Sequence, residues 1–356
     1  MSFKIHFQNK VYDGETFASM IWHEDYAANT ARFLYNWYHK LPFIFFTSGS
    51  TGAPHAFGFN KEQLQASARL TITALRLRDY PQHIFCCINP KFVGGAMMIA
   101  RALELDCEIT LVEPNANVLA LLSEDHPYTF ASFVPIQLNV GNFSFSKFNR
   151  FRQVLIGGAN IAPFLETQLK QGLPETFHTY GMTETLSHVA LRRVGKEDSF
   201  YPLAHVKIKM TDGGCICIKT NFINHWIETH DEVNILNDGS FKVLGRSDFV
   251  INSGGIKLNP EQIENAISEA LKVKKLIRGN FMISSISDDD LGQKCICVTT
   301  ESISKFEFQE LIDMISDKLP KYHLPKEIRV ISEWPLTENG KTDRNAVKEL
   351  IHNQGL

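Results

Sequence analysis

Apolar and amphipathic segments alternate along the first half of the chain. Short apolar runs of the kind that form buried strands lie at residues 84–88, 108–112, 129–134 and 154–156. Apolar side chains recur at helical spacing in residues 61–78, 95–105 and 117–122. Because strands alternate with helices, the pattern predicts the α/β class, with a parallel sheet covered by helices on both faces. We expect a further buried strand at residues 41–46.

After about residue 201 the pattern changes to short strands separated by tight turns. Two pairs of such runs, 206–210 with 215–218 and 235–236 with 241–244, flank Asp-Gly turns at residues 212–214 and 237–239. An Asp-Gly turn between short apolar runs is typical of a hairpin. The sequence therefore predicts a β-rich, barrel-like subregion over about 201–245.

A compact α+β unit is expected from Arg246 to the C-terminus. Its predicted elements are an amphipathic helix at 260–271, a strand near Cys295, a helix at 306–319 and a terminal helix after Asp343. The chain is therefore divided into an N-terminal domain, residues 1–245, and a small C-terminal domain, residues 246–356, that is expected to be mobile.

Length and composition limit the class of protein. At 356 residues the chain can form two or three domains, and 44% hydrophobic with 21% charged residues is ordinary for a globular protein. A formal net charge of −3 gives no sign of a nucleic-acid partner. No apolar run is long enough to span a bilayer, and residues 1–7 lack signal-peptide features, so we expect no membrane partner and a cytoplasmic location.

The seven cysteines lie within apolar runs. Cys215 and Cys217, like Cys295 and Cys297, are two residues apart and share one face of a strand. A metal or redox pair is one interpretation. We favour small buried side chains in a reduced protein.

Small hydroxyl and glycine residues follow the apolar run at 41–46. They are Thr47, Ser48, Gly49, Ser50, Thr51 and Gly52. Glycine allows positive φ and close backbone approach, while hydroxyl and amide groups donate to anions. A Walker loop is excluded because no Gly-Lys-Ser/Thr follows. The stretch predicts a phosphate-binding loop, with a simple surface turn as the alternative.

Later motifs accompany this loop in a fixed order. They are Tyr180-Gly181-Met182-Thr183-Glu184-Thr185, Gly245-Arg246-Ser247-Asp248 leading into residues 251–258, and Pro335-Leu336-Thr337-Glu338-Asn339-Gly340-Lys341. With them the chain resembles, over nearly its whole length, the adenylate-forming superfamily of acyl-CoA synthetases, luciferases and carrier-loading adenylation domains. Residues 180–192 and 251–264 most resemble o-succinylbenzoate–CoA ligases of menaquinone biosynthesis.

The resemblance implies an ATP-dependent, AMP-forming acid–thiol ligase. Such an enzyme adenylates a carboxylic acid, here most like o-succinylbenzoate, and transfers the acyl group to CoA with release of AMP and pyrophosphate. ATP, Mg²⁺ and CoA are the implied cofactor and substrates. Adenylation joins two anions, so the site must neutralise charge and align the carboxylate with the α-phosphorus. The alternatives are a ligase for another aryl or acyl acid, a carrier-loading enzyme and a non-catalytic nucleotide-binding protein.

The resemblance also assigns roles to residues. Thr183 and Glu184 would bind the α-phosphate and Mg²⁺, and Lys341 would bridge the carboxylate and the α-phosphate. Asp248 corresponds to a hinge. The nucleotide-binding set comprises the loop at 47–52 with Gly157, Gly158, Ala159, Tyr180, Gly181, Asp231 and Arg246. Within this set, Tyr180 and Gly181 would line one face of the adenine and residues 157–159 the other, while Asp231 and Arg246 would bind the ribose. The passage for CoA would be bordered by Gly255 and Lys257.

A dicarboxylic acid needs donors for the carboxylate that is not activated. Basic or donor side chains at Lys91, Arg101, His188 and Arg192 are candidates, with Gly94 and Gly95 making room. Each of these residues also has an interpretation as a surface or packing residue.

The chain departs from the family pattern in two places and in the length of its front. His55 stands where Lys is usual, His230 replaces the glycine of Thr-Gly-Asp, and only 46 residues precede the phosphate loop, so a shortened front subdomain is expected. These departures motivate the alternative of a non-catalytic binder, whereas Glu184 and Lys341 favour catalysis. The oligomeric state is left open, with a homodimer as one alternative.

Overall fold

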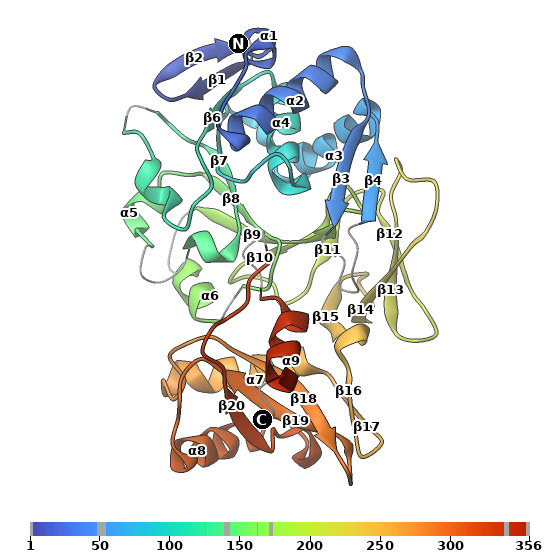
Figure 1. Cartoon of the computed structure of the whole chain (residues 1–356). Coiled ribbons are helices and arrows are strands. Elements are labelled where there is room, and N and C mark those ends of the chain that lie inside the picture. The colour runs from blue at the N-terminus through green and yellow to red at the C-terminus, as the bar shows by residue number, and fades with distance from the viewer. Residues whose placement is uncertain are drawn as a thin grey trace.

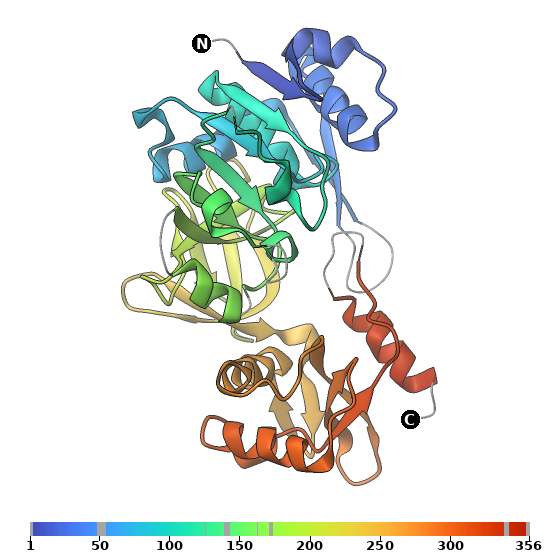
Figure 2. The same ribbon diagram turned by 90° about the vertical axis from the view of Figure 1, so that its left-hand side faces the viewer.

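The structure is a computed structural model that describes residues 3–47, 55–124, 126–138, 143–161, 163–170, 174–337 and 342–353. Figure 1 shows a larger N-terminal part above a smaller C-terminal part. The view turned by 90° shows the same stacking, with the last helix set to one side of the C-terminal part (Figure 2). No helix within the described ranges is long and apolar enough to cross a membrane.

The largest sheet in the described part of the chain has nine strands in the order β11-β10-β9-β8-β7-β5-β6-β1-β2. These strands are β1 (Lys4–Phe7), β2 (Lys10–Asp13), β5 (His83–Cys86), β6 (Glu108–Leu111), β7 (Phe130–Phe133), β8 (Gln153–Ile156), β9 (Glu175–Met182), β10 (Ser187–Arg193) and β11 (Tyr201–Pro202). Strands β9, β8, β7, β5, β6 and β1 are parallel, while β10 and the two edge strands, β11 and β2, are antiparallel to their neighbours. The predicted α/β class with a parallel sheet is confirmed.

Helices and short turns cover both faces of this sheet. They are α1 (Gly14–Ser19), α2 (Asp25–His39), α3 (Lys61–Ala74), α4 (Val93–Leu105), η2 (Val118–Leu121), η3 (Pro135–Leu138), α5 (Phe145–Phe148) and α6 (Pro163–Leu169). Successive strand residues point to opposite faces, so Ile84 packs with α2, α3 and α4, while Phe85 packs with the cluster of α5 and α6. Burial on both faces explains why these strands appear in the sequence as continuous apolar runs. The helix predicted at 117–122 is a 3₁₀ turn, η2.

The run at 41–46 does not form a buried strand. β3 (Phe43–Thr47) pairs with β4 (His55–Phe59) in a separate ribbon. Phe43 and Phe45 are buried, whereas Ile44 and Phe46 are 59% and 61% exposed. The prediction of a buried strand was wrong because the ribbon packs one face on the molecule and leaves the other in solvent.

The β-rich subregion is a second sheet in the order β12-β13-β14-β15. Its strands are β12 (Lys207–Met210), β13 (Cys215–Lys219), β14 (Ile227–Ile235) and β15 (Phe241–Arg246). Both predicted hairpins are confirmed, and the sheet is open rather than barrel-like. Its apolar face packs on β10 through a core that includes Val189 and Phe241.

The C-terminal part has its own mixed sheet in the order β17-β16-β19-β18, with β20 parallel to β19. Its elements are η4 (Ser247–Phe249), β16 (Ile251–Ser253), β17 (Ile256–Leu258), α7 (Pro260–Val273), β18 (Phe281–Asp288), β19 (Gly292–Thr299), α8 (Lys305–Ser316), η5 (Lys321–His323), β20 (Glu327–Val330) and α9 (Arg344–Asn353). Its buried apolar residues, among them Ile263 and Cys297, form clusters that contain no residue before Ile251 in the described chain. This separation supports the proposed boundary between residues 245 and 246.

The cysteines all lie within the described residues, and none forms a disulfide. All are buried except Cys215, which is partly exposed. Burial raises the pKa of the Cys86 thiol to about 11 and that of Cys295 to about 12. Thiols of this kind are unreactive apolar side chains rather than a redox centre.

Candidate active site

The turn between β9 and β10 presents two of the predicted catalytic residues, Thr183 and Glu184. The buried Thr185 hydroxyl lies 2.7 Å from the Ser187 carbonyl oxygen, to which it donates, and accepts from the Met182 N–H at 3.0 Å. Leu186 closes the turn with φ +62° and a fully buried side chain. Burial and these hydrogen bonds hold a backbone conformation that is otherwise costly. The backbone that carries Thr183 and Glu184 is therefore held in one conformation.

Glu184 lines a cavity of about 360 Å³ together with Phe57, Gly58 and Glu228. Carboxylate oxygens are the ligands that Mg²⁺ prefers, and the rest of the cavity lining is mainly apolar, including Ile223 and Trp226. A larger cavity of about 540 Å³ lies against α3, β10 and β11 and is lined by none of the predicted site residues. Of these two cavities, the smaller one is lined by a predicted site residue, Glu184.

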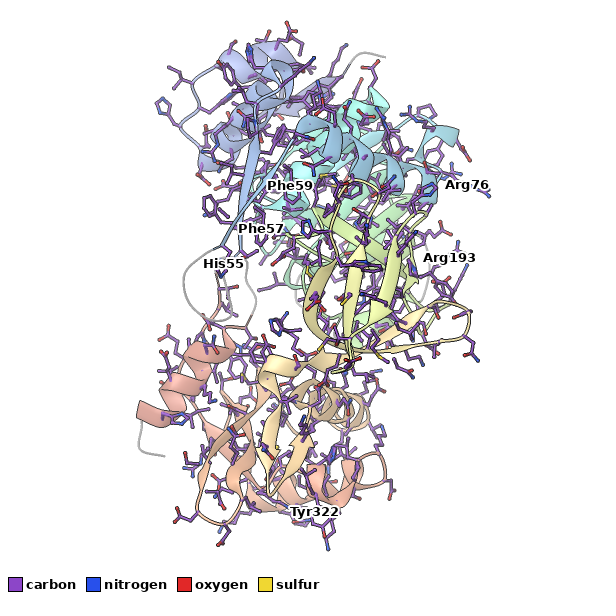
Figure 3. All side chains as sticks on the ribbon, turned by 90° about the vertical axis from the view of Figure 1, so that its right-hand side faces the viewer. His55, Phe57, Phe59, Arg76, Arg193 and Tyr322 are labelled. Atoms are coloured by element: carbon purple, nitrogen blue, oxygen red, sulfur yellow. The ribbon has the colours of Figure 1, made fainter. Side chains whose placement is uncertain are left out.

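The phosphate-loop prediction falls between β3 and β4. Thr47 ends β3 directly opposite His55, which begins β4. His55 is exposed at the end of the ribbon, with Phe57 and Phe59 farther along β4 (Figure 3). Ser48, Gly49, Ser50, Thr51 and Gly52 lie outside the described residues, as does Lys341.

A hydrogen bond joins the large sheet to the second sheet at the predicted ribose site. The Tyr180 hydroxyl donates to Asp231 Oδ2 at 2.6 Å, and Arg246 Nη1 lies 3.4 Å from Oδ1 of the same carboxylate. Asp231 and Arg246 face each other across β14 and β15. Burial, and next the Asp231 charge, raise the pKa of Tyr180, so its hydroxyl stays a donor. The oriented carboxylate keeps lone pairs that can accept from ribose hydroxyls.

Arg246 also forms hydrogen bonds with the predicted hinge residue, Asp248. Its Nε and Nη2 donate to the two Asp248 oxygens at 2.9 and 2.7 Å. Burial acts to raise the pKa of Asp248, but the hydrogen bonds and charge of Arg246 outweigh it, and the pKa lies below its ordinary value. One guanidinium thus connects the ribose-site carboxylate with the start of the C-terminal part.

The predicted adenine-side loop, Gly157–Ala159, follows the carboxyl end of β8. A Cβ at position 157 would lie 2.1 Å from Thr179 Oγ1, and Gly158 has φ +83°, so this loop requires glycine at both positions. Gly181 lies across from it on β9, where a Cβ would lie 2.3 Å from the Ser187 carbonyl oxygen.

His178 is a site residue that the sequence reasoning missed. Its Nε2 donates to the Ala159 carbonyl oxygen at 3.2 Å, and Arg192 donates to its Nδ1 at 3.3 Å. Burial, and next Arg192, lower the pKa of His178 to about 4, which fixes the neutral ring. Its position two residues before Tyr180, on the same side of β9, was the available signal.

The acid-binding candidates fall into two groups. Arg101 and His188 lie together: Arg101 Nη2 donates to Ser187 Oγ at 3.0 Å, and His188 Nε2 lies 3.0 Å from Thr71 Oγ1. Arg192, by contrast, is paired with Glu166 at 2.8 Å.

The remaining candidates begin α4 or precede it. Lys91 is exposed, with its ammonium 5.3 Å from the centre of the Phe92 ring, and Gly94 is exposed in the first helical turn. A Cβ at Gly95 would lie 2.2 Å from the Ile88 carbonyl oxygen. Gly95 is therefore needed for close packing of α4 on the preceding loop rather than for substrate space.

The predicted CoA-passage residues lie in the β16–β17 hairpin, away from β9 and β10 in Figure 1. Gly255 turns the chain with φ +79°, and a Cβ there would meet no described atom within 4 Å. Lys257 is exposed on β17. The hairpin does not border the Glu184 cavity in this arrangement.

Comparisons with known proteins agree with this fold. Residues 20–217 match the family model described as AMP-binding enzyme. The 2-succinylbenzoate–CoA ligases of Listeria monocytogenes serotype 4b and Bacillus anthracis are 26% and 25% identical, each alignment covering 86% of this chain and 69% or 70% of the relative.

Solved structures show the same relationship. An acyl-CoA synthetase (AMP-forming)/AMP-acid ligase II-like protein from Dyadobacter fermentans is 32% identical, with a TM-score of 0.59, covering 95% of this chain and 98% of that one. The o-succinylbenzoate CoA synthetase of Bacillus subtilis, in complex with its acyl-adenylate intermediate, shares the fold at 22% identity and a TM-score of 0.72, covering 86% and 68%. The chain belongs to the AMP-binding enzyme family.

Proposed function

We propose that the protein is an ATP-dependent ligase that adenylates o-succinylbenzoate and transfers the acyl group to CoA. The observation that carries the proposal is the Tyr180–Asp231 hydrogen bond, which joins residues 51 apart. It supports the proposal because it holds Asp231 against Tyr180 on β9, just before the Thr183–Glu184 turn. The names of the similar ligases from Listeria and Bacillus support the same acid.

In the first half-reaction a carboxylate oxygen of the acid attacks the α-phosphorus of ATP, and pyrophosphate leaves. Asp231 accepts from the ribose, while Thr183 donates to the α-phosphate. Glu184 would hold Mg²⁺, which neutralises phosphate charge when bound. Lys341, by family resemblance, stabilises the charge that develops between carboxylate and phosphate.

In the second half-reaction the CoA thiolate attacks the acyl carbonyl carbon, and AMP leaves with the oxygen of the former carboxylate. We propose that residues 246–356 turn at Asp248 for this step, so that Gly255 and Lys257 border the passage for CoA. Such a rotation would move Lys341 out of the active site and bring the CoA thiol into it. A similar Bacillus subtilis structure in complex with ATP and a magnesium ion supports ATP and Mg²⁺ as ligands.

Arg101 supports a dicarboxylic substrate. It is 2% exposed, its Nε has no hydrogen-bond partner among the described residues, and its Nη2 donates to an uncharged hydroxyl, Ser187 Oγ. A buried cation without an anion is costly, so a second substrate carboxylate next to Ser187 would compensate it. Burial lowers the pKa of Arg101 to about 9, which leaves it charged at pH 7.

The test is pyrophosphate release from ATP with a panel of acids, with and without CoA. We expect o-succinylbenzoate to be used far better than benzoate, acetate or a fatty acid. An analogue without the aromatic carboxylate should lose about tenfold or more in kcat/KM, because the donors are left unpaired. Preference for a monocarboxylic acid would reject the acid assignment and leave the ligase chemistry, whereas ATP binding without turnover of any acid would favour the non-catalytic alternative.

Arg101→Met separates the role of this residue from general damage. It should lower kcat/KM about tenfold for the dicarboxylic acid and leave the monocarboxylic analogue unchanged. Arg69→Met is the control, because Arg69 on α3 is exposed and paired with Glu104. Equal losses with both acids would remove Arg101 from the acid site.

A further inference from the structure

Histidine side chains gather around one carboxylate on the neighbouring strands β5, β6 and β1 of the large sheet. His6 Nε2 lies 2.8 Å and His83 Nδ1 lies 3.7 Å from the same Glu108 oxygen. The ligand atoms of these residues all lie within 4.8 Å of one another. The ring of His126 is centred 4.7 Å from that of His6 and 4.9 Å from that of His83. We call these residues the histidine cluster.

Strand register builds this cluster. His83 begins β5 and Glu108 begins β6, and the two are paired in the parallel ladder. His6 on β1 pairs with Thr110, two residues after Glu108 and so on the same face. His83 and Glu108 lie at the amino ends of their strands, whereas the Gly157–Ala159 loop follows the carboxyl end of β8. The cluster is therefore separate from the candidate active site.

A neighbouring hydroxyl orients His83 for ligation. His83 Nε2 lies 2.8 Å from Thr110 Oγ1, which leaves Nδ1 directed at Glu108. Histidine ligands of metals usually donate their other ring N–H to such an acceptor.

We propose that His6, His83 and Glu108, completed by His126, form a binding site for one Zn²⁺-like divalent transition-metal ion. Imidazole nitrogens with one carboxylate are a ligand set that suits Zn²⁺. Zn²⁺ ligands in a tetrahedron lie roughly 3.3 Å apart, so small side-chain rotations close the cluster around an ion. The ion would link β1, near the sheet edge, to β6 and β5 in the interior.

The experiment uses the chelator-treated full chain, titrated with Co²⁺ and then with Zn²⁺. We expect one Co²⁺ per chain, with the visible absorption of a tetrahedral nitrogen and oxygen site and without thiolate charge-transfer absorption. Zn²⁺ should displace Co²⁺ and raise the Tm, because an ion that binds only the folded state stabilises it.

Variants locate the site. His6→Gln and His126→Gln, both at partly exposed positions, should each weaken Co²⁺ binding at least tenfold, and Thr110→Val should weaken it about 10- to 100-fold without removing a ligand. The exposed His23→Gln is the control and should bind like the wild type. Thiolate absorption, or equal affinity in His6→Gln and the wild type, would overturn the proposal. These spectra do not depend on pyrophosphate release, so the two proposals fail independently.

Discussion

At the residue scale, the Tyr180 hydroxyl fixes the orientation of the ribose-site carboxylate. Tyr180→Phe removes the 2.6 Å hydrogen bond and leaves Asp231 with Arg246 alone. Hydrogen bonds to charged groups contribute about 1.5–3 kcal/mol, so we expect the Kd for ATP to rise about tenfold or more, measured by titration calorimetry.

The control for this change is Tyr201→Phe. Tyr201 also reaches a carboxylate, Asp238, but at 3.4 Å and on the surface. Loss of the Tyr201 hydroxyl should leave the Kd for ATP unchanged. Identical Kd values for Tyr180→Phe and the wild type would remove the hydroxyl from the binding site.

The lowered pKa of His178 predicts that the folded protein loses stability in mild acid. Its pKa is about 4 in the folded protein against an ordinary 6.5, so between these pH values the unfolded chain binds more protons. Stability is thus fully present above pH 6.5 and falls by up to about 1.4 kcal/mol per pH unit as the pH drops toward 4. His178→Gln should make the fall in Tm between pH 7 and pH 5 smaller, when measured by calorimetry with a chelator present. His39→Gln, at an exposed position, should keep the wild-type dependence.

At the element scale, the β9–β10 turn depends on one buried hydroxyl. Thr185→Val keeps the shape but removes the hydrogen bonds to Met182 and Ser187. An unpaired buried N–H costs about 1–3 kcal/mol, and the turn should loosen around Thr183 and Glu184. We expect pyrophosphate release to slow about tenfold and to need more Mg²⁺.

Thr30→Val provides the comparison for the turn. Thr30 is equally buried, and its hydroxyl donates to the Tyr26 carbonyl within α2. Thr30→Val should lower the free energy of unfolding without changing the Mg²⁺ requirement of pyrophosphate release. An unchanged requirement in Thr185→Val as well would show that the turn does not position the metal ligand.

Elements buried on both faces could be predicted from the sequence, and others could not. The runs at 84–88 and 154–156 match β5 and β8 closely because continuous apolar runs fit strands covered on both sides. The exposure of Phe46 could not be predicted, because it depends on which strands pair. The role of His178 was hidden for the same reason, since its partner Ala159 lies on another strand's loop.

At the scale of the whole molecule, the proposed rotation at Asp248 predicts that the two half-reactions can be separated. Gly255→Leu should leave pyrophosphate release unchanged and lower CoA thioester formation at least tenfold, because the side chain would fill the passage. Gly239→Leu is matched, since both glycines have φ near +80° and open space around the missing Cβ. It should bear the same backbone strain and keep both reactions. Thioester formation at the wild-type rate in Gly255→Leu would contradict the proposal that Gly255 borders the passage for CoA.

The opposite separation is expected for Lys341→Ala. This variant should lose pyrophosphate release but still convert a supplied acyl-adenylate to the thioester, in rapid-quench assays. Equal loss of both reactions would contradict the rotation.

Alkylation of the buried thiols can measure local opening of the native chain. Iodoacetamide reacts with thiolates, so a buried thiol of raised pKa is alkylated only when its segment opens, at a rate set by the opening free energy. Cys86 lies in one core and Cys297 in that of the C-terminal part. If residues 246–356 open as a separate unit, rising urea exposes these two thiols at different concentrations, and if the chain opens as one body they are labelled together. Mass spectrometry of the labelled chain can therefore tell whether the two parts open separately or as one body.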